Sequence, residues 1–345
     1  FIDKIANNYP TVQNINEPKL VKEVSNNPLL LTLLYLVVEE TGEIPSNRSC
    51  LYKEGSNILL KKWDNTRSVE RDWVYKKLPL QRKEDLLSQI ALKTFERGDY
   101  CFNHNELKQY ITDYICNLPD TETNLEVLKL DSEAVLKSIV TQHEILVELT
   151  EGIYAFSLLA FHEYFAAKEI VDKSDPQALQ KALQELVSHI TEARWREVFL
   201  LAVSMVRNAD YLLSLIKRQT DALVTSEPQL QQFLSWNEQY SNSDKASLKP
   251  LALRAFALEF VLNLDFDARR LDKKLAYNLS FNRARISKYT QKLQSFQFTE
   301  QQQKVLKQYY DANKLLLDCL NNAHYVTRGL REEIENNLFV PSEIL

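Results

Sequence analysis

Glycine is scarce in this chain, with only 5 glycines among 345 residues. Glycine is the residue that most readily adopts the left-handed backbone of tight turns, and glycine-rich loops bind phosphates through their backbone N–H groups. Leu, Lys, Glu and Gln, which all favour helices, are in contrast plentiful. The chain is therefore predicted to be mainly α and multi-helical, without a phosphate-binding loop of its own.

Composition and charge narrow the class of protein further. Hydrophobic residues make up 45% and charged residues 26% of the chain, which is a globular balance. The net charge of −5 argues against a large nucleic-acid interface, because such interfaces are basic. The 4 cysteines are far apart and form no CxxC pair, so we expect free thiols and a cytoplasmic location. The chain opens on Phe1 rather than Met, and we expect it to be a segment of a longer protein.

The clearest helix signal is "NNPLLLTLLYLVVEETGEIP". Asn27 is a good N-cap, and Pro28 suits the first helical position, where a missing N–H costs nothing. Gly42 and Pro45 close the element. The helix is apolar nearly all round, which predicts a central position in its layer, and its 11-residue apolar core is too short to span a bilayer. Two short helices are predicted before it, in residues 1–25.

Four further helices are predicted from apolar residues at helical spacing. Three of them cover "KEDLLSQIALKTFERGD", "NHNELKQYITDYICNLP" and "DSEAVLKSIVTQHE", the last beginning at Asp131, whose charge suits a first turn. The other helix is "RSCLYKEGSNILLKKWD". Its core-facing residues are expected to be Leu51, Ile58, Leu59 and Trp63.

Residues 145–157, "ILVELTEGIYAFS", alternate on both sides of a glycine turn and predict a short β-hairpin. An aromatic-rich helix, "LLAFHEYFAAKEIV", follows at once. Three helices, a hairpin and a closing helix are the order of a winged-helix domain. Inside the closing helix, His162 and Glu163 are expected to be a partly exposed surface pair, because acid–base catalysis needs a second positioned group and none can be named.

Beyond Pro176 the pattern predicts helices only, with loops at 224–229 and 241–250. Residues 251–286 mix Ala, Leu and Phe with evenly spaced charges and predict one long helix, built from a degenerate repeat. Two more helices, "EQQQKVLKQYYDANKLLLDCLNN" and "TRGLREEIENNLF", complete the chain. Three domains are predicted: a helical domain at 1–83, a winged-helix domain at 84–172 and a C-terminal helical domain at 173–345.

The sequence contains neither a known catalytic motif nor a basic DNA-reading surface. It contains no phosphate loop, GxSxG, HExxH or paired Cys/His spacing, so the chain is not expected to be an enzyme by itself. The helix before the hairpin and the hairpin turn would be the DNA-reading elements of a winged helix, but they are acidic and would be repelled by phosphates. Their charged residues are Asp131, Glu133, Glu144, Glu148 and Glu151 against Lys137.

Two stretches together indicate a family. "NPLLLTLLYLVVEETGEIPSNRSCLYKEGSNILLKKWD" and "ILVELTEGIYAFSLLAFHEYFAAKEI" closely resemble the region C-terminal to the nucleotide-binding core of NACHT-domain NTPases. These are signal-transduction ATPases of the STAND class, and the resemblance is strongest to cyanobacterial, NLR-like proteins. "RWREVFLLAVSMVRNADYLL" and "QKVLKQYYDANKLLLDCLNN" are similar to the helical C-terminal domain that such proteins carry. The resemblance covers most of the chain.

The resemblance implies a nucleotide-gated switch. In this family an ATPase core with Walker A and Walker B motifs precedes the segment, and the helical and winged-helix domains fold over the nucleotide. ADP holds the module closed, and exchange for ATP lets it open and oligomerise. The implied cofactors are ATP and ADP, with Mg in the core. The implied partners are the protein's own core and further copies of itself, in cytoplasmic signalling or antiviral defence without membrane or nucleic acid.

The resemblance also assigns two nucleotide-binding positions. Pro28 matches the family proline that packs by the nucleotide base. The family's sensor histidine, in a Phe-x-His pattern, matches Leu158, which can neither donate a hydrogen bond to phosphate nor carry charge. His162, one turn further on, does not simply replace it. Weaker closure, another residue in this role and a decayed copy are the open explanations, and a free-standing helical interaction module without nucleotide dependence is the alternative function.

Overall fold

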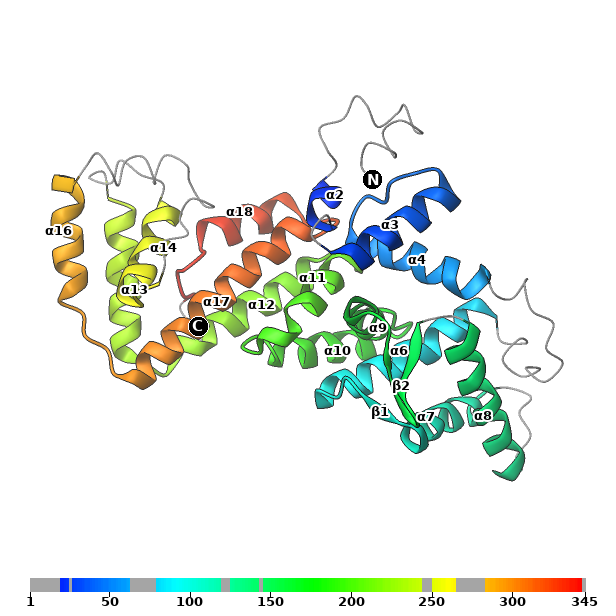
Figure 1. Cartoon of the computed structure of the whole chain (residues 1–345). Helices are drawn as coiled ribbons and strands as arrows, with labels where there is room; N and C mark the ends of the chain where they lie inside the picture. The colour runs from blue at the N-terminus through cyan, green and yellow to red at the C-terminus, as the bar shows by residue number, and fades with distance from the viewer. Residues whose placement is uncertain are drawn as a thin grey trace. The chain divides into compact units, whose positions relative to one another are not determined.

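The chain forms two compact units, residues 1–172 and 173–345, and each is described by itself. The protein is seen as a computed structural model (Figure 1). As the glycine scarcity predicted, its described part is mainly α, with one small antiparallel sheet. No described helix is long and apolar enough to cross a membrane. The structure describes residues 19–24, 27–62, 79–118, 125–142, 145–243, 250–264 and 283–342.

In the first unit, the helix that follows Asn27 begins and ends where its sequence signals predict. The Asn27 side chain accepts hydrogen bonds from two N–H groups of the next helix, at 3.1 and 3.2 Å, and Pro28 is the first residue of that helix. Gly42 ends it with φ +75°, a conformation that costs glycine little. Most of residues 1–25 lie outside the described residues. The helices here are α2 (Lys19–Val24), α3 (Pro28–Thr41) and α4 (Arg48–Lys62).

Helix α3 buries only one face, so the prediction that it lies centrally in its layer is wrong. It packs against α2 and α4 through that face. On the other side Leu29 is 59% and Tyr35 is 44% exposed. An apolar sequence predicts burial but not how many neighbours a helix has. The buried residues are Leu33, Leu34, Val37 and Val38.

The face that α4 buries differs in part from the predicted one, although Leu51 is buried as predicted. An added Cβ at Gly55 would lie 2.5 Å from Leu33 Cδ1, so the glycine allows a close approach of α3. Because α3 lies so close at Gly55, α4 buries the face that carries its small residues. Ile58 and Leu59 are therefore only half-buried. Trp63 lies outside the described residues. The residues that α4 buries are Ser49, Leu51, Tyr52, Gly55, Ser56 and Leu60.

A sheet in the order β1–β3–β2, antiparallel throughout, lies in the rest of the first unit. The predicted hairpin is present as β2 and β3, and Gly152 in its turn has φ +73°. The edge strand β1 was not predicted, because two residues cannot show an alternating pattern. The elements are α6 (Leu80–Arg97), β1 (Phe102–Asn103), α7 (His104–Cys116), α8 (Leu125–Gln142), β2 (Leu146–Thr150), β3 (Ile153–Phe156) and α9 (Leu159–Val171).

The helices around this sheet confirm most predicted features. Gly98 ends α6 with φ +75°, and the Asn103 side chain caps α7 by accepting from the Glu106 N–H at 2.9 Å. The prediction that the next helix begins at Asp131 is wrong: α8 begins at Leu125, because the preceding residues are themselves good helix formers. Helix α9 packs against α6, α4 and β3.

The described residues of the second unit form helices and the connections between them, with no strand among them. Its longest helix, α17, starts at a capping box between Thr299 and Gln302 and packs against α11, α12 and α14. The loop predicted at 224–229 shrinks to the short junction between α12 and α13. The elements are α10 (Pro176–Ser188), η2 (Ala193–Trp195), α11 (Arg196–Met205), α12 (Asp210–Thr225), α13 (Pro228–Ser241), α14 (Pro250–Val261), α16 (Arg283–Gln294), α17 (Glu300–Asn322) and α18 (Arg328–Asn336).

The single long helix predicted for residues 251–286 is wrong. Helix α14 ends at Val261, and Asn263 follows with φ +50°. Asn tolerates the left-handed region better than most residues, so it ends a helix much as glycine does. Residues 265–282, which hold most of the predicted repeat, lie outside the described residues.

Candidate functional site

Pro28 lies at the start of α3 with an exposed side chain. Its missing N–H costs nothing there, since a first-turn N–H has no partner within a helix. The surface beside it is partly apolar, because Leu29 and Tyr35 of the same helix are also exposed. The α3 N-terminus therefore presents a small apolar surface that can receive a ring or an apolar side chain.

Leu158 lies immediately before α9, in extended backbone with φ −127° and ψ 133°. Its carbonyl accepts hydrogen bonds from the N–H groups of Phe161 at 3.0 Å and His162 at 3.3 Å. Its side chain is half-buried, and no side chain caps this helix start. Uncapped N–H groups and the helix dipole favour an anion at such a position, but leucine adds no donor of its own.

Pro28 and Leu158 belong to the same unit. Helix α4 packs against both α3 and α9, so it connects the two helices at whose N-termini these residues lie. Among the described residues, no hydrogen bond or ring contact joins the two positions. Their role in nucleotide binding stays a prediction.

His162 is buried, so the expectation of a partly exposed surface pair is wrong. Its side chain is only 2% exposed, because it lies on the face of α9 that packs against α6. Its Nε2 lies 3.1 Å from the Ala91 carbonyl oxygen and 2.9 Å from Thr94 Oγ1. Since a carbonyl can only accept, Nε2 carries the proton and donates it. The neighbouring Glu163 is half-buried.

Four aromatic rings surround His162 and favour the uncharged form of its imidazole. The Phe156 ring stacks on the imidazole with centroids 4.7 Å apart, and the other three meet it edge-on at 5.3 to 5.8 Å. This burial lowers the pKa of His162 to about 4, although the hydrogen bond to Ala91 opposes the shift. The imidazole is therefore neutral near pH 7 and acts as a structural group. The edge-on rings belong to Phe95, Tyr100 and Phe102.

A polar cluster that the sequence did not reveal joins α7, α8 and β3. Glu133 Oε2 accepts hydrogen bonds from Lys108 Nζ at 2.8 Å and His104 Nε2 at 2.9 Å, and His104 Nδ1 lies 3.3 Å from the Tyr154 hydroxyl. Burial raises the pKa of Glu133, but the bonds from Lys108 and His104 outweigh it and lower the pKa below its usual value. The cluster ties two helices to the hairpin, and no motif spacing could have predicted it.

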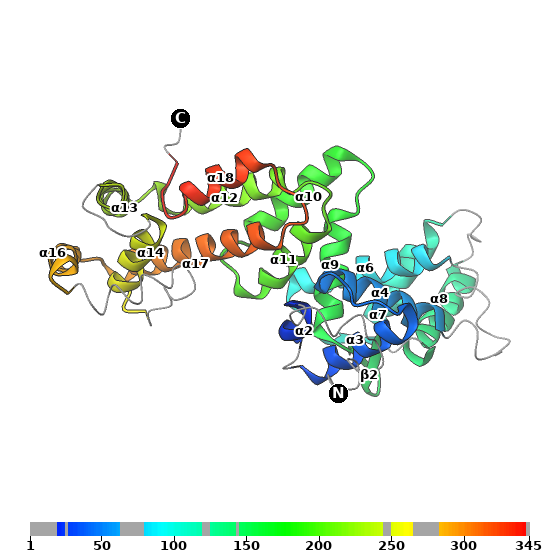
Figure 2. The same cartoon turned by 90° about the horizontal axis from the view of Figure 1, so that it is seen from above.

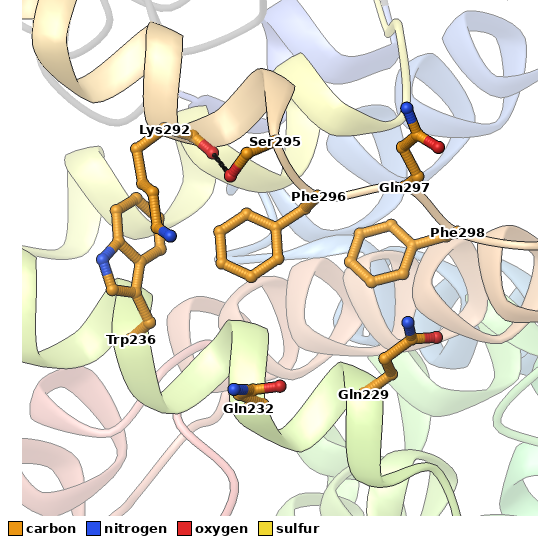
Figure 3. A pocket seen from close by; sticks show the side chains of 8 residues that line it. All are labelled: Gln229, Gln232, Trp236, Lys292, Ser295, Phe296, Gln297 and Phe298. Atoms are coloured by element: carbon orange, nitrogen blue, oxygen red, sulfur yellow. Dashed lines mark hydrogen bonds between the residues drawn. The ribbon is translucent and has the colours of Figure 1, made fainter.

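The second unit has a shallow pocket of about 310 Å³ between α13, the end of α16 and the connection to α17 (Figure 3). The Trp236 and Phe296 rings lie 5.2 Å apart, and Lys292 Nζ lies 5.4 Å from the centre of the Phe296 ring. The polar side chains of its wall are all exposed, and the Ser295 hydroxyl already donates to the Lys292 carbonyl at 2.7 Å, so the wall presents no buried polar group to orient a ligand. The lining residues are Gln229, Gln232, Trp236, Lys292, Ser295, Phe296, Gln297 and Phe298.

Metal ligands do not gather anywhere in the part of the chain that the structure describes. No group of three or more His, Cys, Asp or Glu side chains there could hold a metal ion. The four cysteines are free thiols, and burial raises the pKa of Cys319 well above its usual value, so this thiol stays protonated.

Comparison with known families identifies the last part of the chain. Residues 273–341 match the model of NACHT C-terminal Helical domain 2, and within the match lie α16, α17 and α18. This part is a NACHT-associated C-terminal helical segment, as the sequence resemblance predicted. A domain of this kind is not itself catalytic. No curated protein and no solved structure gives a significant match to the chain.

Proposed function

We propose that this chain is the regulatory part of a NACHT NTPase, acting as a nucleotide-gated switch in cytoplasmic signalling or antiviral defence. The observation that carries the proposal is the match of residues 273–341 to a NACHT C-terminal helical domain. The order of α6, β1, α7, α8, the hairpin and α9 supports a winged-helix domain in the first unit. The partners are an ATPase core of the same protein and, in the open state, further copies of it.

The first unit fits an accessory role toward ATP or ADP. The exposed Pro28 ring is suited to pack by a base, and the uncapped start of α9 is suited to lie near a phosphate. Bound nucleotide supplies negative charge, and the core with its Mg is proposed to hold that charge. Leu158 offers the phosphates no donor, so this chain is proposed to close weakly over ADP. A hydrogen bond to a charged group contributes about 1.5–3 kcal/mol, which corresponds to tenfold or more in a closed–open equilibrium.

Replacing Leu158 with histidine tests this proposal in the protein that includes the ATPase core. We expect Leu158→His to tighten ADP binding about tenfold and to shift the protein toward the monomer, because it restores a donor at the start of α9. Leu159→His is the matched control, since Leu159 is the next residue and is 54% exposed. Calorimetric ADP titration and light scattering measure the two effects. Equal affinity and equal assembly in all three proteins would refute the sensor role of this position.

The same proposal predicts that this segment alone does not hydrolyse ATP. The expected result is phosphate release at the background rate, since catalysis is assigned to the core. Turnover above background that a substitution within this chain abolishes would contradict it.

A free-standing helical interaction module is the second candidate. The exposed apolar side chains of Leu29 and Tyr35 on α3, and of Leu149 on the hairpin, favour contact with another protein. The two candidates differ in their response to nucleotide. Assembly that is the same with ADP, with ATP and without nucleotide, in the protein that includes its upstream sequence, would favour the interaction module.

A further inference from the structure

The segment that follows α18 is irregular in backbone yet buried. Leu338 is 0%, Phe339 2% and Val340 8% exposed, although no helix or strand includes them. Phe339 has φ +60°, an unusual conformation for a residue with a bulky side chain. The segment can be followed in red after α18 in Figure 2. Residues 337–342 are called the terminal segment below.

Side chains from the second unit's helices hydrogen-bond to the backbone of this segment. Arg254 of α14 donates to two carbonyls, that of Asn336 at 2.8 Å and that of Leu338 at 2.9 Å. Asn313 of α17 accepts from the N–H of Phe339 at 2.9 Å. Two of these bonds hold the carbonyl and the N–H of the peptide group between Leu338 and Phe339, and the third holds the carbonyl of Asn336, the last residue of α18. None of them involves a side chain of the segment.

Helix α12 holds the far end of the terminal segment in the same way. Lys217 donates to the Val340 carbonyl at 2.9 Å, and Asp221 accepts from the Ser342 N–H at 3.0 Å. These two α12 residues also pair with each other at 2.6 Å, so each side chain holds the other in the position from which it bonds to the backbone.

The groups that contact the terminal segment are themselves positioned and largely shielded from water. Asn313 is fully buried, and its amide donates to the Tyr309 carbonyl at 2.9 Å, which fixes the direction of its oxygen. Arg254 is 4% exposed, and burial lowers its pKa. Within the described residues the Arg254 guanidinium donates hydrogen bonds to the carbonyls of Asn336 and Leu338. The Phe339 ring stacks 5.8 Å from that of Tyr310.

We propose that the groove between α12, α14 and α17 is a peptide-binding site, and that the terminal segment is an intrachain occupant which a partner's peptide can replace. Hydrogen bonds to the main chain provide affinity that does not depend on the peptide's side chains, while the apolar contacts select them. The partner's peptide takes the same turn, in which the Val340 N–H donates to the Asn337 carbonyl at 3.1 Å, and it carries three consecutive apolar residues, the middle one aromatic. This inference is independent of the proposed nucleotide switch.

A labelled peptide of residues 337–342 tests the proposal on the complete chain. The variant Phe339→Ala weakens the intrachain occupant and leaves the groove intact. Because a site that is occupied less often binds a competitor more tightly, we expect the variant to bind the peptide at least about tenfold more tightly than the unmodified chain. Fluorescence anisotropy measures binding, and circular dichroism shows that the variant is folded.

The double variant Phe339→Ala with Asn313→Leu is the control, and we expect it to lose the gain because the groove has lost the acceptor for the Phe339 N–H. A folded Phe339→Ala chain that binds the peptide no better than the unmodified chain, or a double variant that binds as well, overturns the proposal. Hydrogen exchange on the unmodified chain decides the case in which Phe339→Ala does not fold. The amides of Phe339 and Ser342 should then exchange at least about tenfold faster than those in the centre of α17. Equal rates would overturn the proposal.

Discussion

His162 in the first unit and Arg254 in the second are both buried basic side chains, but they are accommodated in opposite ways. Burial lowers the pKa of both. Imidazole responds by losing its charge, so aromatic rings and one carbonyl are sufficient neighbours for His162. A guanidinium cannot lose its proton in a protein, so Arg254 requires acceptors and takes them from the terminal segment. A neutral polar group can be satisfied locally, whereas a charged one ties distant segments together.

Replacing each residue with an apolar one gives the largest expected effect and tests this difference. We expect Arg254→Met to lower the free energy of unfolding of the second unit by about 4 kcal/mol, because the buried Leu338 carbonyl and the partly buried Asn336 carbonyl both lose a charged donor. His162→Phe should cost the first unit only about 1 kcal/mol, since a ring of similar size replaces a neutral group. Urea unfolding followed by hydrogen exchange separates the units through amides of α6 and α17. Equal losses would show that the charge difference is unimportant.

Acid should destabilise the first unit through His162. Its pKa is about 4 when folded and about 6.5 when unfolded, so the unfolded chain binds more protons between these values. The stabilisation is fully present above pH 6.5 and is lost as the pH falls toward 4, in total about 3 kcal/mol. Unfolding of the first unit should be measured at pH 7, 5.5 and 4, with His162→Phe as the control. A variant as acid-sensitive as the unmodified chain would assign the effect to other groups.

Features that depend on neighbours in sequence were predicted well. Asn27, Gly42, Gly98 and the hairpin turn at Gly152 act through adjacent backbone groups, so each leaves a local signal in the sequence. The match of residues 273–341 to NACHT C-terminal Helical domain 2 likewise agrees with the predicted family resemblance. Neither candidate nucleotide position is tested by the geometry, because their proposed ligand and core lie outside this chain.

Features that depend on tertiary contacts were missed. Strand β1 is recognisable only through its pairing of Phe102 with Tyr154. The burial of His162 requires α6 and the sheet to close around it, and a single sequence position does not reveal this. Arg254 and Asn313 meet the terminal segment from positions 84 and 26 residues away. No periodicity or motif relates such residues, so only the folded structure shows them.

The smallest expected effects come from alanine substitutions at two helical glycines. Comparing them distinguishes the cost of tight packing from the gain in helix propensity. At Gly55 of α4 a new Cβ would lie 2.5 Å from Leu33 Cδ1, whereas at Gly329 of α18 it would meet nothing within 4 Å. Alanine favours helices by about 1 kcal/mol over glycine, and overpacking a core costs about 1–3 kcal/mol.

Gly329→Ala should therefore stabilise the second unit by up to about 1 kcal/mol. Gly55→Ala should destabilise the first unit by about 1 kcal/mol, because Leu33 is buried and has little room to move. Thermal unfolding of the two variants checks both signs. If both substitutions stabilise, the approach of α3 to α4 is loose, and the small residues of α4 do not determine which of its faces is buried.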